Sequence, residues 1–153
     1  MSNIYDWIDE GGYSEGSPDD PRFKEIQERW RAIIPKRRVI IAGGRDIHDY
    51  DKVVEAIEES GFRIDVVVSG GAKGVDALGE RYAEENDLNL AIFRADWQTH
   101  GRAAGPIRNR KMAENADALI AIWDGKSRGT KNMIETAQKK GLMVYVKVLD
   151  LKS

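Results

Sequence analysis

From residue 38 onward, short apolar runs alternate with segments in which apolar residues recur every three or four positions. The apolar runs predict five strands, at residues 39–42, 64–68, 88–93, 118–123 and 142–148. The segments between them predict helices beginning near residues 50, 75, 106 and 129, and residues 94–105 predict a long connection. Short apolar strands that alternate with helices form a parallel sheet covered on both faces. The predicted fold class is therefore α/β, with three layers (α/β/α) around a mainly parallel sheet of about five strands.

The first 36 residues differ in composition from the rest of the chain. Residues 1–20 are polar, acidic and rich in Gly, Ser and Asp. They are interpreted either as a mobile tail or as an arm that packs on its own domain or on a neighbouring subunit. Asp20 and Pro21 are typical of a helix start, and the apolar spacing that follows predicts an N-terminal helix over residues 21–34. We therefore expect a polar tail and helix at residues 1–36 and an α/β domain at residues 37–153.

Composition excludes several classes of function. The chain has a formal net charge of −2, which gives no support to nonspecific nucleic-acid binding, and no cysteine, which excludes disulfides and thiolate metal sites. His48 and His100 lack the spacing of a zinc site, so neither a metal nor a cofactor is expected. No apolar run approaches the ~18 residues of a membrane span and no signal peptide precedes the domain, which predicts a cytoplasmic protein without membrane contact.

Three of the predicted strands end in glycine-rich turns. Gly43-Gly44-Arg45 follows the first strand, Ser69-Gly70-Gly71 follows the second, and residues 124–130 follow the fourth. Glycine lets the backbone approach a ligand closely, and the next helix offers free N–H groups and a partial positive charge. A single turn of this kind also occurs for purely structural reasons. Three turns on the carboxyl edge of one parallel sheet favour a ligand site for a nucleotide-type phosphate.

The charges beside the turns assign different roles to them. Asp76 begins its helix, suits the helix dipole and would repel an anion, so it is expected to accept hydrogen bonds from ribose hydroxyls or to brace the loop. Lys126, Arg128 and Lys131 instead surround a helix start, where cations oppose the dipole unless an anion lies between them. We therefore expect a phosphate at residues 127–130. The alternative is a solvated basic loop.

Arg108 is the strongest single candidate for binding. A helix that begins at Pro106 would place Arg108 in its first turn, where a cation is unfavourable without an anionic partner. A guanidinium also suits forked contacts to phosphate. The alternative is that it pairs with a carboxylate, including one across a subunit interface. Trp97 is expected at the same edge, where it either stacks on a base or packs against the protein. Neither the P-loop pattern nor Gly-x-Ser-x-Gly occurs, so neither triphosphate hydrolysis nor a nucleophilic Ser69 is expected.

At these residues the chain resembles the SLOG superfamily of Rossmann-like nucleotide-binding domains, and within it the small DUF2493, YspA-like group. The features that carry the resemblance are Ala42-Gly43-Gly44-Arg45, Ser69-Gly70-Gly71-Ala72, Gly74-Val75-Asp76, Asp96-Trp97, Gly101-Arg102, Ala104-Gly105-Pro106-Ile107-Arg108-Asn109, Gly129-Thr130 and Asn132-Met133. The resemblance implies a Rossmann-like fold and a sensor or binding module for a nucleotide-derived ligand, with ADP-ribose or an NAD-related molecule as examples. It also implies a homo-oligomer. The expected ligand-binding residues are Gly43, Gly44, Arg45, Ser69, Gly70, Gly71, Asp76, Trp97, Arg102, Arg108, Ser127, Gly129, Thr130 and Asn132.

The same superfamily includes enzymes and DNA-binding proteins, which supply two alternatives. LOG phosphoribohydrolases cleave nucleoside monophosphates, and Arg108 and Gly129-Thr130 match their arginine and Gly-Thr pair. Asn132, however, occupies the position of their catalytic glutamate, and an amide cannot act as that carboxylate. If the chain is a hydrolase, Glu135 or Asp76 would have to replace it. The second alternative is binding of single-stranded DNA, as in DprA.

Overall fold

The computed structural model describes residues 22, 25, 26, 29 and 36–150. The chain divides into two compact units, at residues 1–35 and 36–153, which are treated separately. In the first unit all four described residues are helical and fall within the predicted helix 21–34, and Arg29 forms an ion pair with Glu25 at 3.4 Å. The expected tail at residues 1–20 lies outside the described residues.

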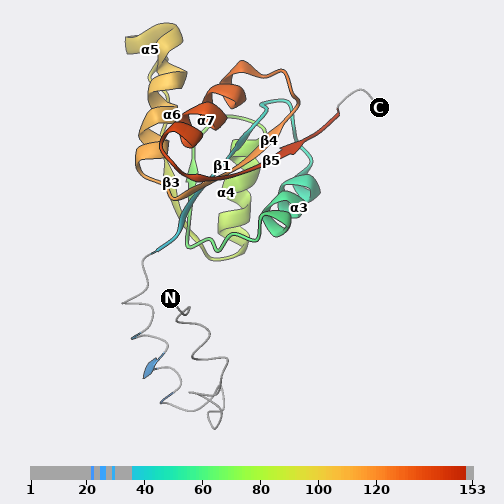
Figure 1. Cartoon of the computed structure of the whole chain (residues 1–153), viewed down its shortest axis with the longest axis vertical. Coiled ribbons are helices and arrows are strands. Elements are labelled where there is room, and N and C mark those ends of the chain that lie inside the picture. Colours follow the sequence, from blue (N-terminus) through green and yellow to red (C-terminus); the bar gives the residue numbers. More distant parts are fainter. Residues whose placement is uncertain (1–21, 23–24, 27–28, 30–35, 151–153) are drawn as a thin grey trace. The chain divides into compact units, whose positions relative to one another are not determined.

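The second unit is an α/β domain with one five-stranded sheet (Figure 1). Its elements are β1 (Arg38–Gly43), α3 (Tyr50–Ser60), β2 (Val66–Ser69), α4 (Val75–Glu85), β3 (Asn89–Ile92), α5 (Trp97–His100), the 3₁₀ turn η2 (Gly101–Ala103), α6 (Ala104–Glu114), β4 (Ala118–Trp123), α7 (Arg128–Lys139) and β5 (Met143–Val148). The strand order is β3-β2-β1-β4-β5, and every neighbouring pair is parallel. The predicted Rossmann-like α/β fold is confirmed.

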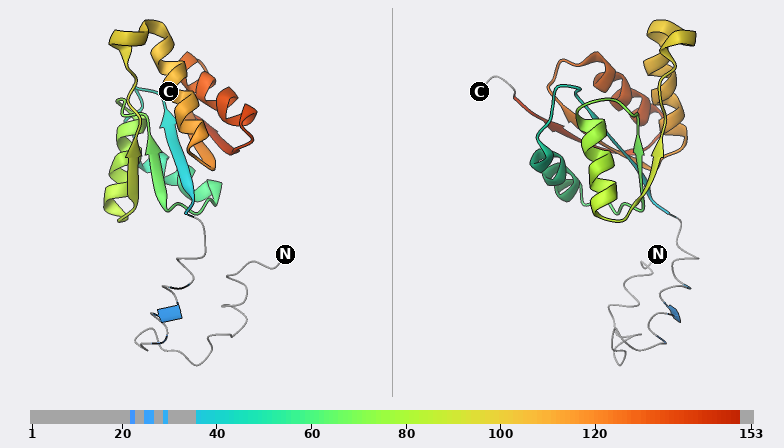
Figure 2. Two further views of the ribbon diagram at one scale, coloured as in Figure 1. Left: turned by 90° about the vertical axis from the view of Figure 1, so that its left-hand side faces the viewer. Right: turned by 180° about the vertical axis from the view of Figure 1, so that it is seen from behind.

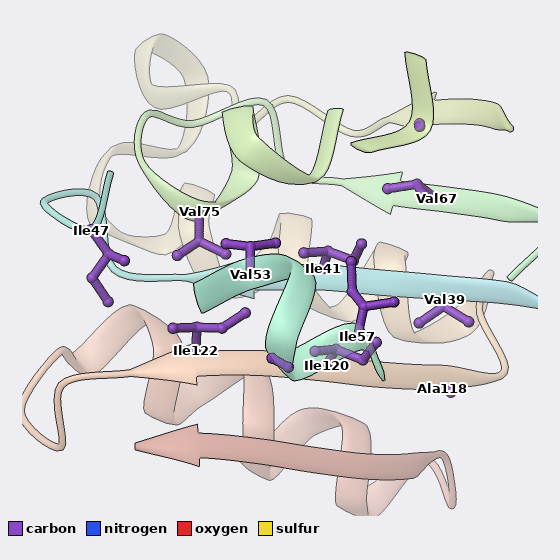
Figure 3. Close-up of a cluster of buried hydrophobic side chains, with 12 residues drawn as sticks. Val39, Ile41, Ile47, Val53, Ile57, Val67, Val75, Ala118, Ile120 and Ile122 are labelled. Carbon is purple, nitrogen blue, oxygen red and sulfur yellow. The ribbon is translucent and has the colours of Figure 1, made fainter. Parts of the chain in front are cut away.

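Apolar residues that alternate along the central strands explain why helices cover both faces of this sheet. Ile41 and Ile120 pack with residues of α3 and α4, such as Val53 and Val75, in one buried cluster (Figure 3). Their sequence neighbours point to the other face and pack with residues of α6 and α7 in a second cluster, which contains Ile40, Ala42, Val68, Met112, Leu119, Ala121 and Met133. Figure 2 shows the sheet between its two helical layers. Each fully buried aliphatic side chain contributes about 1.5–3 kcal/mol, so burial on both faces fixes the strand register.

The connection between β3 and β4 differs from the prediction. Residues 94–105 contain α5 and η2, and α6 begins at Ala104, not at Pro106. Proline is tolerated in a first helical turn because the N–H groups there have no intrahelical acceptor. The preceding residue, Gly105, has no Cβ to clash with the proline ring, so the helix extends through it. Arg108 consequently lies in the second turn of α6 and not at its start.

Candidate functional site

The site lies where the direction of the chain across the sheet reverses. From β1 the chain winds through β2 to β3, then crosses to β4 and β5 on the opposite side of β1. The loops after β1 and β4 therefore diverge, and in open α/β sheets this divergence leaves a crevice at the carboxyl ends of the strands. A pocket of about 490 Å³ lies there, bordered by the turns after β1 and β4 and by α5 and α6. Its volume falls within the range of small-molecule sites.

Most of the residues expected to bind a ligand meet in this pocket. The lining includes Gly43, Gly44, Arg45, Asp76, Trp97, Arg102, Arg108, Ser127, Gly129, Thr130 and Asn132. Ser69, Gly70 and Gly71 are not part of the lining, although Ala72 of the same turn is. Glu135 does not line the pocket either, and its side chain is exposed on α7.

The turn after β1 is shaped by close backbone contacts. A Cβ on Gly43 would collide with the Ile122 carbonyl oxygen and lie 2.8 Å from Cγ2 of Val75. The Gly44 N–H donates to the Ile122 carbonyl at 3.2 Å, and the Gly44 carbonyl accepts from the Val75 N–H, also at 3.2 Å. Gly43 thus has a structural role that requires no ligand. It lets β1, β4 and the start of α4 converge beneath the pocket.

The turn after β2 is held by buried polar side chains. The Ser69 hydroxyl is fully buried, donates to Glu80 Oε2 at 2.8 Å and accepts from the Gly71 N–H at 3.1 Å. Asp76 is 5% exposed and its Oδ2 accepts from the Ala72 N–H at 3.2 Å. Burial raises the pKa of Asp76, while the Ala72 hydrogen bond and the charge of Arg108 act to lower it. The carboxyl group therefore braces this turn and also borders the pocket.

Arg108 links the two glycine turns through α6. Its Nη1 donates to the Gly70 carbonyl at 2.8 Å, and its Nε donates to Oδ1 of Asn109 at 3.0 Å. Asn109 Nδ2 in turn donates to Asn132 Oδ1 at 2.9 Å and reaches the Gly129 carbonyl at 3.4 Å. Burial lowers the pKa of Arg108 and the nearby Asp76 carboxylate opposes that shift, but an arginine remains charged. The network places a fixed positive charge in the pocket wall.

The loop between β4 and α7 presents the start of α7 to the pocket. Asp124 Oδ1 accepts from the N–H groups of Lys126 and Ser127, both at 2.8 Å, and these hydrogen bonds lower the pKa of Asp124. The indole N–H of Trp123 donates to the Ser127 carbonyl at 3.1 Å, so this ring braces the loop and does not line the pocket. Ser127 caps α7, and its hydroxyl accepts from the Thr130 N–H at 3.4 Å.

The first turn of α7 has the properties of an anion site. The Arg128 and Gly129 N–H groups precede Thr130 in the helix, where no intrahelical acceptor exists. A Cβ on Gly129 would meet no atom within 4 Å, so the backbone there faces open space. The first turn contains no acidic residue, and Lys126, Arg128 and Lys131 are exposed around it. Free donors, the helix dipole and cations therefore coincide at one wall of the pocket.

Trp97 and Arg45 border the pocket from different elements. Trp97 belongs to α5, a one-turn helix without buried residues, and its side chain is 50% exposed. The Arg45 guanidinium lies over the indole ring at 5.7 Å from its centroid, a cation–π contact that joins α5 to the turn after β1. Its large exposed ring area makes Trp97 a surface on which a planar group can stack.

Asn109 is a buried residue of this site that sequence reasoning missed as a binding candidate. It is 4% exposed and connects Arg108 to the start of α7. A signal was present, because Met112 and Ala113 follow at spacings of three and four and mark the buried face of α6. An asparagine on such a face needs hydrogen-bond partners within the protein.

Metal ions and membranes are two further kinds of partner on which the described residues give information. Within that part of the chain, no three His, Asp or Glu side chains are grouped so as to hold a metal ion. No helix there is long and apolar enough to cross a membrane.

Comparisons with known proteins agree with the fold. The pattern of the YspA, cpYpsA-related SLOG family matches residues 37–100, from β1 to the end of α5. The Gene 61 protein of Mycobacterium phage D29 is 36% identical over an alignment of 118 residues, and the match covers 71% of this chain and 94% of that protein. The X-ray structure of DNA processing protein A (DprA) from Streptococcus pneumoniae superposes with a TM-score of 0.59 at 18% identity, over 76% of this chain. The chain spans about half of the DprA chain, 52% of its length, and the similarity is one of fold.

Proposed function

The chain belongs to the YspA, cpYpsA-related SLOG family, and from this membership and the pocket between β1 and β4 we propose that it binds a nucleotide-derived phosphate ligand as a sensor or binding module. Membership of this family implies a module for nucleotide-derived ligands. The observation that carries the proposal is the convergence of Arg108, Asp76 and the first turn of α7 on one pocket of about 490 Å³.

The phosphate is assigned to the first turn of α7. The Arg128 and Gly129 N–H groups lie at the positive end of the helix dipole and can donate to the phosphate. Gly129 has no side chain to block the approach of the phosphate. Exposed Lys126 and Lys131 add positive charge nearby. This arrangement of cations at a helix start is unfavourable in the free protein and becomes favourable with an anion between them.

The sugar and the base are assigned to other parts of the pocket lining. Asp76 borders the pocket as an acceptor for ribose hydroxyls, and Trp97 offers its exposed ring to the base. A base placed on Trp97 would take the position that the Arg45 guanidinium holds at 5.7 Å from the ring. ADP-ribose and NAD-related molecules carry all three groups and are the ligands to test first.

Calorimetric titration with AMP, ADP-ribose and NAD tests this proposal. Arg128→Ala should weaken binding about tenfold, since a contact to a charged phosphate is worth roughly 1.5–3 kcal/mol. Lys139→Ala is the matched control, because Lys139 is an exposed cation at the other end of α7, and it should change affinity less than about twofold. The proposal fails if none of the three ligands binds, or if both variants lose affinity equally.

One observation favours hydrolysis of an N-glycosidic bond as a second candidate function. Asp76 is a buried carboxyl group with a raised pKa that borders the pocket, which is typical of a general acid or base. Against this, Asn132 supplies an amide where the hydrolases of the superfamily have a glutamate, and that amide is engaged by Asn109. Incubation with nucleoside monophosphates distinguishes the two functions. Release of free base that is lost in Asp76→Asn but kept in Glu135→Gln would establish the enzyme, and binding without release would establish the sensor.

A further inference from the structure

A second, smaller hollow lies against Arg108, between α6 and the loop that follows β3. It has a volume of about 250 Å³ and is bordered by Arg94, His100, Arg108 and Lys111, with Asp96 as its acidic residue. Arg108 also borders the larger pocket, so the two hollows share this side chain as a common wall.

The elements around the smaller hollow concentrate positive charge in it. Arg108 and Lys111 are separated by three positions and lie on the same face of α6. Arg94 enters from the loop after β3, and its guanidinium makes a long hydrogen bond of 3.4 Å to the Gly71 carbonyl. Asp96 is committed to capping α5, where its Oδ1 accepts from the Thr99 N–H at 3.1 Å.

Among the described residues, two of these cations, Arg94 and Lys111, are not paired with a carboxylate, whereas Arg108 lies near Asp76. Within residues 36–150 neither Arg94 nor Lys111 takes part in an ion pair, whereas Lys140 pairs with Glu114 and Lys147 with Glu55 and Glu59. Cations that border a hollow without carboxylate partners attract an anion of matching size. Arginine and lysine side chains together are typical ligands of phosphate groups.

We infer that the smaller hollow, formed by Arg94, His100, Arg108 and Lys111, binds a second phosphate group beside the ligand of the larger pocket. This inference rests on the proposed function, because it places the first phosphate at α7. Since Arg108 borders both hollows, the ligand class that fits them together is a nucleoside that carries phosphates at two separate positions. A free phosphate ion has the same chemistry and would occupy the same hollow.

Titrations with three probes test the inference and identify the source of the phosphate. They are AMP, adenosine 3′,5′-bisphosphate, and inorganic phosphate added alone and to the AMP-saturated protein. The variant is Lys111→Ala, whose residue is exposed and borders only the smaller hollow. Arg110→Ala is the matched control, because it removes the same charge from the same helix. Arg110 is exposed and borders neither hollow.

We expect the bisphosphate to bind at least tenfold more tightly than AMP, and Lys111→Ala to remove about tenfold of that gain. AMP affinity in Lys111→Ala, and both affinities in Arg110→Ala, should stay within about twofold of the unmodified protein. If the protein binds inorganic phosphate and Lys111→Ala loses that binding, the hollow is supported as a phosphate site whose occupant is a free ion. The inference is overturned if neither the bisphosphate nor inorganic phosphate depends on Lys111. In that case AMP binding would leave the proposed function standing. If instead none of AMP, ADP-ribose and NAD binds, the proposed function is rejected, and inorganic phosphate still tests the hollow.

Discussion

Replacing Gly129 by alanine tests whether this glycine is needed for ligand binding and not for the stability of the fold. Gly129 is the second residue of α7, it is exposed, and its Cβ would meet no atom within 4 Å. It is not among the glycines with positive φ. The free protein therefore accommodates the added methyl group, while the same methyl would occupy the space through which a phosphate approaches the Arg128 and Gly129 N–H groups.

The two effects have opposite signs. Alanine is favoured over glycine in a helix by up to about 1 kcal/mol, and about half of this is expected in a first turn, which raises Tm by roughly 2 °C. In the complex, the displaced phosphate loses one charge-assisted hydrogen bond, which is worth about 1.5–3 kcal/mol. Affinity for AMP should then fall by about tenfold to a hundredfold.

Thermal unfolding with and without AMP, together with calorimetry, measures both effects. Gly43→Ala is the contrasting variant, because its Cβ would overlap the Ile122 carbonyl and lie 2.8 Å from Cγ2 of Val75. We expect it to destabilise the free protein by about 1–3 kcal/mol. If Gly129→Ala binds AMP with the same affinity as the unmodified protein, the placement of the phosphate is refuted. Gly129→Ala that unfolds at a clearly lower temperature would refute the geometry of the helix start.

Three further outcomes follow from the site. Burial raises the pKa of Asp76 above its ordinary 3.8, so the free energy of unfolding should fall as pH rises from that value through the folded-state pKa. Asp76→Asn should remove this pH dependence when the free energy of unfolding in urea is measured against pH. An unchanged pH dependence in the variant would show that burial does not raise the pKa of Asp76. Trp97→Leu should weaken AMP about tenfold through lost stacking but leave ribose 5-phosphate unaffected, and an equal loss for both ligands would contradict base stacking. Asn109→Ala should cost about 2 kcal/mol of stability because Arg108 Nε and Asn132 Oδ1 each lose a partly buried hydrogen-bond partner. A negligible change in urea unfolding would show that the network is not stabilising.

The sequence was sufficient for the fold because local patterns determine it. Continuous apolar runs such as residues 118–123 form strands that are buried on both faces, and the observed strands begin and end within about two residues of the predicted ones. The start of α6 was wrong by two residues because Gly105 removes the clash that usually ends a helix before proline. The expected homo-oligomer and cytoplasmic location stay predictions.

The site could be predicted only in part because its partners are distant in sequence. The glycine turns were located from local pattern and from the rule that ligands bind at the carboxyl edge of a parallel sheet. The partner of Arg108, the Gly70 carbonyl, lies 38 residues away along the chain, and Asn109 reaches Asn132 over 23 residues. Such contacts arise from the packing of α6 against the sheet and α7, which no local pattern specifies.

The most direct test of the central claim is an amide NMR titration of the nitrogen-labelled protein with AMP and ADP-ribose. A ligand in the pocket between β1 and β4 should shift the amide signals of Gly44, Arg128 and Gly129 together and with one common affinity. Saturable shifts at these three positions, reduced in Gly129→Ala, are the predicted result. Shifts confined to other surfaces, or no shifts with either ligand, would contradict the claim that this pocket binds a nucleotide-derived phosphate.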